Sequence, residues 1–168
     1  LTSNGEVIEK GSRYAVGHVV VEPLYDLINA SGVIKISNGG THTLALLSSG
    51  NVIAWGYNDY GQCNVPGGIA GRVVAISAGD SHSLALLNDG SVVAWGNTAD
   101  NRCEVPAGMI ASSISAGYNW SVAVTVDGNV VKWGYSFGSF YEVPTGLNEV
   151  QQVVAGRSAF LALKNNRE

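Results

Sequence analysis

The amino-acid sequence predicts an all-β fold built from repeated antiparallel units, and two observations carry this prediction. A short apolar phrase ending in Trp-Gly recurs about every 40 residues, each time directly after a glycine. Two further apolar runs precede most copies, the first of them rich in β-branched residues in the clearest copy, and small and polar residues separate the two. The phrase occupies residues 51–56, 91–96 and 129–134, and a divergent copy without the tryptophan occupies residues 6–11.

Residues 71–110 show the elements of one repeat most clearly. The apolar runs at 73–77 and 82–87 predict a first and a second strand. Asn88-Asp89-Gly90 is a strong hairpin signal, because glycine reaches positive φ without a steric penalty, and a third strand at 91–96 follows. A polar loop then leads to residues 103–106, for which we expect a short edge segment, since proline suits the edge of a sheet.

Small residues follow the first strand of each copy, and they predict a close approach of backbones near a central axis. Short strands with small residues at one end describe a propeller blade. We therefore expect a β-propeller or partial propeller of about four blades, with three to four antiparallel strands in each. A β-solenoid is the alternative, but its rungs are usually shorter than about 40 residues. The small pairs are Asn38-Gly39, Ala78-Gly79, Ala116-Gly117 and Ala155-Gly156.

The whole chain, residues 1–168, is interpreted as a single repeat domain. The last blade lacks a third strand, which residues 1–11, a second chain or sequence outside this one could supply. Because an unpaired apolar edge is an aggregation liability, we expect the chain not to be a free-standing, fully closed monomer. The expected units are a divergent first copy at 1–31, clear copies at 32–70, 71–111 and 112–150, and a partial blade at 151–168.

The composition is that of a folded, turn-rich chain. Charged residues make up 13% of it, the net charge is −4, and lysines and arginines do not cluster, so we expect no nucleic-acid partner. No apolar run is long enough to span a bilayer, so we expect no membrane insertion. The localisation stays open, and a bacterial or viral extracellular or surface location is slightly favoured.

Two sets of repeat-equivalent residues are expected to be structural. Trp55, Trp95 and Trp133 share one position and should fill the gap between repeats, since each aromatic side chain buries roughly 150–250 Å². Cys63 and Cys103 share another position. Equivalent positions on neighbouring units usually lie too far apart for a disulfide, so both are expected to be free thiols.

No catalytic residue, metal site or cofactor is expected. His42 and His82 are repeat equivalents, and Trp120 takes their place in the third copy, which argues for structural roles. Asp80, Ser81 and His82 contain the letters of a catalytic triad, but adjacent residues on a strand cannot converge as a triad must. The sequence has no phosphate loop, zinc-ligand spacing or EF-hand.

The phrase at residues 77–86, followed by residues 89–96, resembles the RCC1-type repeat (regulator of chromosome condensation). The short period and residues 61–66 look most like its bacterial branch, which includes a propeller-shaped β-lactamase inhibitor protein. The resemblance covers residues 32–163 well and residues 1–31 poorly. It implies an RCC1-like β-propeller, although such propellers usually have more blades than the copies present here. The family includes exchange factors, enzyme inhibitors and adhesion modules, so the fold alone does not select a function.

In RCC1-type inhibitors, partner contacts come from the segments after the small-Gly pair and after Trp-Gly. The resemblance therefore implies a non-enzymatic protein–protein binding module that presents loops on one face. Tyrosine and tryptophan are typical hot-spot residues, although Trp120 equally fits packing against the next blade. The expected partner-binding residues are Tyr57, Asn58, Asp59, Tyr60, Asp80, Ser81, Asn97, Asp100, Tyr118, Asn119, Trp120, Phe137, Phe140 and Arg157, beside Thr41, Ser136 and Ser158.

Two other functions stay open. The chain could be a structural, assembly or adhesion domain of a larger surface or virion protein, as a homo-oligomer or as part of a longer parent chain. It could also bind carbohydrate, with Tyr118, Trp120 and Phe137 as stacking platforms. In the leading hypothesis the partner is another protein, whose identity the sequence does not contain.

Overall fold

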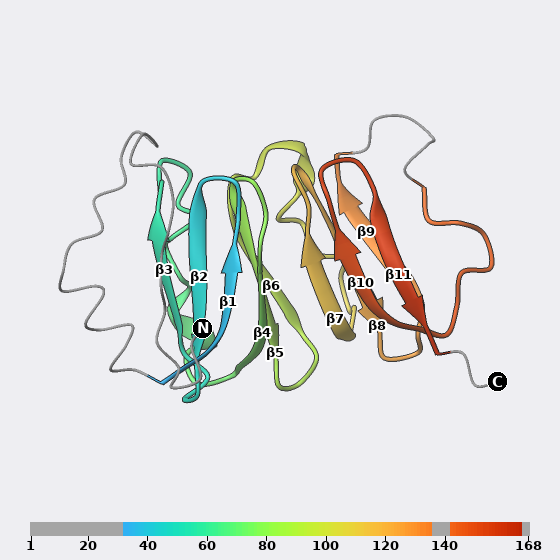
Figure 1. The fold of residues 1–168 in the computed structure, drawn as a ribbon, viewed down its shortest axis with the longest axis horizontal. Helices are drawn as coiled ribbons and strands as arrows, with labels where there is room; N and C mark the ends of the chain where they lie inside the picture. The colour runs from blue at the N-terminus through green and yellow to red at the C-terminus, as the bar shows by residue number, and fades with distance from the viewer. Residues whose placement is uncertain (1–31, 136–141, 166–168) are drawn as a thin grey trace.

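The computed structural model describes residues 32–135 and 142–165, and the strands in these ranges form four antiparallel sheets standing side by side (Figure 1). We call these sheets blades 1 to 4. The expected all-β, propeller-type fold is confirmed. Blade 1 contains β1 (Val33–Asn38), β2 (His42–Leu47) and β3 (Val52–Gly56); blade 2 contains β4 (Val73–Ala78), β5 (His82–Leu87) and β6 (Val92–Gly96); blade 3 contains β7 (Ala111–Ala116), β8 (Trp120–Thr125) and β9 (Val130–Gly134); blade 4 contains β10 (Val150–Ala155) and β11 (Phe160–Lys164).

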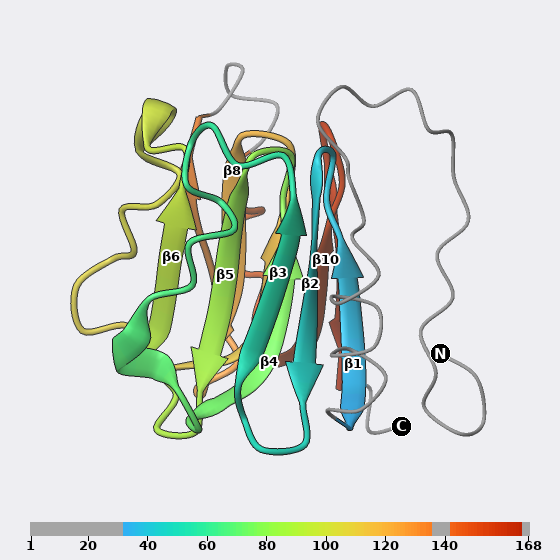
Figure 2. The same cartoon turned by 90° about the vertical axis from the view of Figure 1, so that its left-hand side faces the viewer.

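Each blade is an up-and-down meander, as Figure 2 shows for β1, β2 and β3. The turn between the second and third strands contains a glycine at positive φ, as its sequence predicts. The carbonyl oxygen of that glycine also accepts a hydrogen bond from the first strand of the next blade, which ties neighbouring blades together at their hairpin ends. These bonds are Val73 N to Gly50 O (3.2 Å), Ala111 N to Gly90 O (2.8 Å) and Val150 N to Gly128 O (3.0 Å).

The first strands of successive blades lie beside one another, so β4 contacts β1 on one side and β7 on the other. The small residues that follow these strands permit this approach. Asp80 N donates to Gly117 O over 3.2 Å, and a Cβ atom added at Gly79 would lie 2.7 Å from that same oxygen. The expected close approach of backbones at the small-Gly pairs is confirmed.

The hydrophobic core lies between the blades. Trp95 packs in one cluster with Leu44 and Leu46 of blade 1 and with Val73 and Ile76 of its own blade. The equivalent Trp55 and Trp133 are buried as well, so the expected packing role of the three tryptophans is confirmed. Both cysteines are free thiols, also as expected.

The expected edge segment at residues 103–106 was wrong, since neither it nor its counterpart at 63–66 forms a strand. Local turns satisfy the backbone there: Glu104 N donates to Asn101 O over 3.0 Å, and Val105 N to Cys103 O over 3.1 Å. Val105 packs its side chain on the core between blades 2 and 3. The segment therefore covers the core without joining a sheet, and blades 1 to 3 have three strands each.

Blade 4 has two strands within the described residues, and β11 has no neighbour there on its outer side. Leu161 and Leu163 of β11 are 77% and 57% exposed. Residues 1–11, one expected source of a third strand, lie outside the described residues, so their pairing with β11 stays a prediction.

The open edge of β11 leads us to expect a mass above that of one 17.5 kDa chain when the protein is sized by light scattering. Replacing both Leu161 and Leu163 by lysine should return the particle to a single chain, because charge on an edge strand opposes pairing. A wild-type monomer whose Val7 and Ile8 amides are strongly protected from hydrogen exchange would instead show closure within one chain.

Candidate binding face

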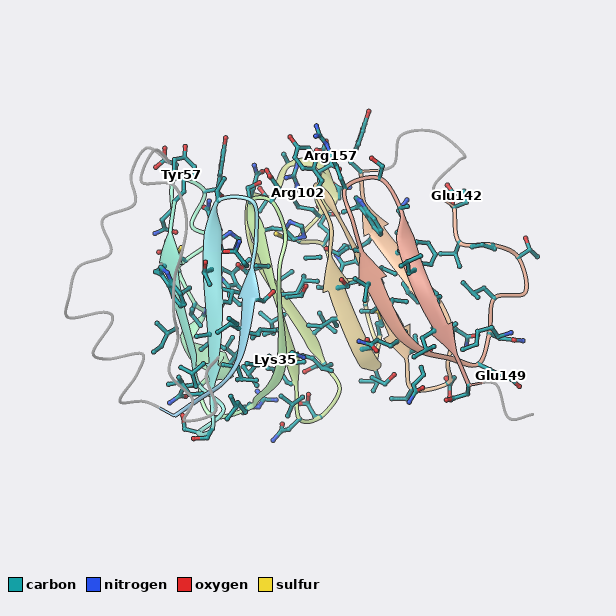
Figure 3. All side chains as sticks on the ribbon, viewed as in Figure 1. Lys35, Tyr57, Arg102, Glu142, Glu149 and Arg157 are labelled. Carbon is teal, nitrogen blue, oxygen red and sulfur yellow. The ribbon has the colours of Figure 1, made fainter. Side chains whose placement is uncertain are left out.

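The loops that follow the first and third strands emerge at the same end of every complete blade, because the strands of a meander alternate in direction. We call this end the loop face. Backbone hydrogen bonds join the two loops of each blade: Tyr57 N to Thr41 O (3.0 Å), Asn97 N to Ser81 O (2.9 Å) and Tyr135 N to Asn119 O (3.1 Å). Figure 3 shows Tyr57, Arg102 and Arg157 at this end and Glu149 at the opposite one.

A hollow of about 330 Å³ opens on the loop face where blades 1, 2 and 3 meet. The structure thus brings together many of the residues that sequence analysis selected from three separate repeats. Blade 1 contributes Thr41, Tyr57 and Tyr60; blade 2 contributes Asp80, Ser81, Asn97, Asp100 and Arg102; blade 3 contributes Tyr118 and Asn119.

Arg102 lines this hollow, and sequence analysis did not select it. Its side chain is almost fully buried, and its three nitrogens are all engaged: Nε donates to Ala99 O (2.8 Å), Nη1 to Ser81 Oγ (3.2 Å) and Nη2 to Asp100 Oδ2 (2.7 Å). Arg102 occupies the repeat position of Gln62, which is also buried. A charged residue at a position that is neutral in the neighbouring copy was the signal that could have revealed it.

Tyrosines and carboxylates form the rim. Tyr57 and Tyr60 meet edge-on with their ring centroids 6.3 Å apart. The Tyr57 hydroxyl donates to Asp59 Oδ2 over 2.6 Å, and this hydrogen bond raises the pKa of Tyr57. The guanidinium of Arg157, in the loop between β10 and β11 of blade 4, lies over the ring of Tyr118 of blade 3 at 5.0 Å from its centroid. The rim therefore combines aromatic surface with groups of both charges.

Trp120 does not belong to the accessible face, which corrects its selection as a partner-binding residue. It is 4% exposed, its ring meets that of Phe160 edge-on at 6.2 Å, and its Nε1 donates to Arg157 O over 3.3 Å. The open choice between binding and packing is thus decided for packing. Blade 4 carries Phe160 where blades 2 and 3 carry the buried Ser83 and Ser121, so an aromatic ring suits this boundary better than a histidine does.

Other expected residues differ in accessibility and role. Ser81 is buried, and its hydroxyl accepts the bond from Arg102. Asn58 and Asn97 brace their own loops, because their Oδ1 atoms accept hydrogen bonds from Cys63 N and Ala99 N. Asp59 is exposed beside Tyr57, outside the hollow. Phe137 and Phe140 lie outside the described residues.

The repeat-equivalent histidines His42 and His82 join neighbouring blades. His42 Nε2 lies 2.8 Å from Ser83 Oγ, and His82 Nε2 lies 2.9 Å from Ser121 Oγ. Each serine hydroxyl donates to a backbone carbonyl, Ser83 to Gln62 O and Ser121 to Arg102 O, so each Nε2 must carry the proton that is donated to the serine. The same two carbonyls accept from the indoles of Trp95 and Trp133.

The Nδ1 atoms of His42 and His82 are buried and have no hydrogen-bond partner in the part of the chain that the structure describes. Burial lowers the pKa of His42 to about 4, and burial lowers that of His82 to about 3 with a smaller contribution from Arg102. The imidazoles are therefore neutral structural donors, and the expectation that they are structural is confirmed. Because His82 bonds to Ser121 and Ser81 bonds to Arg102, the sequence Asp80-Ser81-His82 forms no triad.

Within ranges 32–135 and 142–165, no group of three or more His, Cys, Asp or Glu side chains could hold a metal ion. The same ranges contain no helix of the length and apolarity needed to cross a membrane.

Antiparallel blades that stand side by side with their first strands adjacent define the architecture of a β-propeller, or of part of one. The family model for the regulator of chromosome condensation (RCC1) repeat matches residues 33–62 and 73–103. Blades 1 and 2 therefore carry RCC1-type repeats, as the resemblance implied.

Known proteins agree with this assignment. The X-linked retinitis pigmentosa GTPase regulator homolog of Caenorhabditis elegans is 36% identical over 77 residues, which cover 39% of this chain and 5% of that protein. The ectodomain of the Arabidopsis thaliana receptor kinase ACR4 superposes with a TM-score of 0.67 at 20% identity, over 80% of this chain and 47% of that one. Prp20p of Saccharomyces cerevisiae, whose structure was described with its binding to Gsp1p and histones, superposes with a TM-score of 0.63 at 22% identity, over 80% of this chain and 44% of that one. This chain thus spans a small fraction of the curated relative and less than half of each structure.

Proposed function

We propose that this domain is a non-enzymatic protein-binding module whose partner docks on the loop face around the hollow. The observation that carries the proposal is the exposure of aromatic side chains there: Tyr60 and Tyr118 are 54% and 42% exposed on the rim of one concave site. Exposed tyrosines around a hollow are typical of interface hot spots. RCC1-type repeats commonly serve protein interaction, and the relation to Prp20p supports this class of function without naming a partner for this chain.

Rigid presentation of the loops also favours binding. Backbone hydrogen bonds hold the two loops of each blade together, and Gly40 N to Gly79 O (3.1 Å) and Asp80 N to Gly117 O (3.2 Å) join blade to blade directly beneath the face. A preformed surface loses little conformational entropy when a partner binds. The hydrogen-bonded loops of the loop face therefore suit a site that binds its partner without a prior change in loop conformation.

To test the proposal, a phage-displayed random-peptide library is selected on the wild-type protein, and the dissociation constants of individual peptides are then measured. The Tyr60→Ala/Tyr118→Ala variant should weaken binding by about 30-fold or more, which is the hot-spot scale of about 2 kcal/mol. Val74→Ala/Val126→Ala is the control, because both valines are exposed but do not line the hollow. Peptides that bind the tyrosine variant as well as the wild type would contradict a binding role for the loop face.

An assembly role is a second candidate, and the exposed apolar edge of β11 favours it. It differs from the leading proposal in the surface used, because β11 would pair with another chain while the loop face stays free. The light-scattering experiment with lysine at positions 161 and 163 separates the two: an unchanged particle mass in that variant would remove the support for assembly through β11.

A further inference from the structure

We propose that the hollow on the loop face binds one cationic side chain, of arginine or lysine, which the partner presents to the carboxylate of Asp80. This inference rests on the proposed function and adds the chemistry of the partner. Its basis is a concave site that combines aromatic walls with a carboxylate that has no counterion within residues 32–135 and 142–165.

The carboxylate of Asp80 has neither a hydrogen-bond donor nor an ion-pair partner among the described residues, although it is partly buried. Asp80 forms hydrogen bonds through its backbone: its N–H donates to Gly117 O over 3.2 Å, and its carbonyl accepts from Thr41 Oγ1 over 2.9 Å. Removing a charge from water without a partner is costly, so a bound cation would supply the missing interaction.

The other charges that line the hollow are already paired. Arg102 and Asp100 form a salt bridge of 2.7 Å, and the remaining engaged nitrogens of Arg102 donate to Ala99 O and Ser81 Oγ. Arg102 therefore neutralises Asp100 and is not free to receive an anion. The charge that remains within the hollow is the negative one of Asp80.

The aromatic walls fit the same kind of ligand. A cation over an aromatic face within about 6 Å is attracted by the ring quadrupole, and the face of Tyr118 already accommodates the guanidinium of Arg157 at 5.0 Å. The volume of about 330 Å³ lies at the lower end of the range of roughly 300–1,000 Å³ for ligand pockets, so it suits one side chain better than a cofactor.

The test uses two capped amino acids of nearly identical shape, N-acetyl-arginine methylamide and its uncharged analogue N-acetyl-citrulline methylamide. Each is titrated into the full chain while amide NMR shifts are followed. We expect saturable shifts at Tyr60, Asp80 and Tyr118, with the arginine compound binding at least about fivefold more tightly. Asp80→Asn should abolish this difference, whereas Asp127→Asn, in the exposed hairpin at the opposite end of blade 3, should leave it unchanged.

Substituting Arg157 distinguishes a cationic from an anionic ligand, because Arg157 competes with a bound cation for the ring of Tyr118 but would attract a bound anion. Arg157→Gln should therefore strengthen binding of the arginine compound. Equal binding of the two compounds, no saturable shift, or weaker arginine binding in Arg157→Gln would each overturn the cation proposal. If the arginine compound does not bind while the selected peptides still require Tyr60 and Tyr118, this inference is wrong and the proposed function stands. If the peptides also bind the Tyr60→Ala/Tyr118→Ala variant as well as they bind the wild type, both are wrong.

Discussion

Acidification from pH 7 to about 4.5 is expected to lower the free energy of unfolding by about 3–5 kcal/mol through His42 and His82 alone. Both imidazoles are buried and neutral in the folded chain, with pKa values of about 4 and about 3, whereas a histidine in the unfolded chain has a pKa near 6.5. As the pH falls below 6.5, the unfolded state takes up protons that the folded state cannot. The contribution is therefore present above pH 6.5 and is lost as the pH falls towards 4.

Urea unfolding at several pH values measures this loss, and the double variant His42→Gln/His82→Gln is its control. A glutamine amide can donate to Ser83 or Ser121 in place of Nε2, but it does not titrate. The variant should be somewhat less stable at pH 7, because its side chains fill the interblade space differently, and its stability should depend less on pH between 6.5 and 4.5. An equally steep pH dependence in the variant would show that other groups cause the acid sensitivity.

Gly79→Ala is expected to destabilise the fold by about 3 kcal/mol, the upper part of the range for overpacked sites. The new methyl group would lie 2.7 Å from the Gly117 carbonyl oxygen and would press on the ring of His82. Either blade 3 must move away from blade 2, or the His82–Ser121 hydrogen bond must break. Both outcomes weaken the contact between two blades.

Gly67→Ala is the matched control for this substitution. A Cβ atom at Gly67 meets nothing within 4 Å, so alanine there should leave stability unchanged or raise it slightly by restricting the unfolded chain. Urea midpoints of the two variants at pH 7 make the comparison. Equal midpoints would mean that the blades separate at little cost and that close packing at the small-Gly pairs is not essential.

Much of the candidate site could be predicted, because repeat equivalence marks the two loops of each blade. Tyr57, Tyr60, Asp80 and Tyr118 were selected from different copies and meet in one hollow. The sequence could not separate accessible residues from buried ones in those loops. Trp120 and Ser81 follow the same pattern as their exposed neighbours, yet both are buried: Trp120 packs against Phe160 of the next blade, and Ser81 accepts a hydrogen bond from the buried Arg102.

The sequence by itself determined the strands, the turns and the repeat of this protein, since these depend on contacts within a few residues. The apolar run of β5, the β-branched start of β6 and a glycine at positive φ between them specify two strands joined by a hairpin. Only the tertiary structure decided which loop residues meet in the hollow, and that the Asp80 carboxylate has no counterion among the described residues. Those properties depend on how the loops of three blades pack against one another, and the repeat that specifies each blade does not encode the residues that differ between copies.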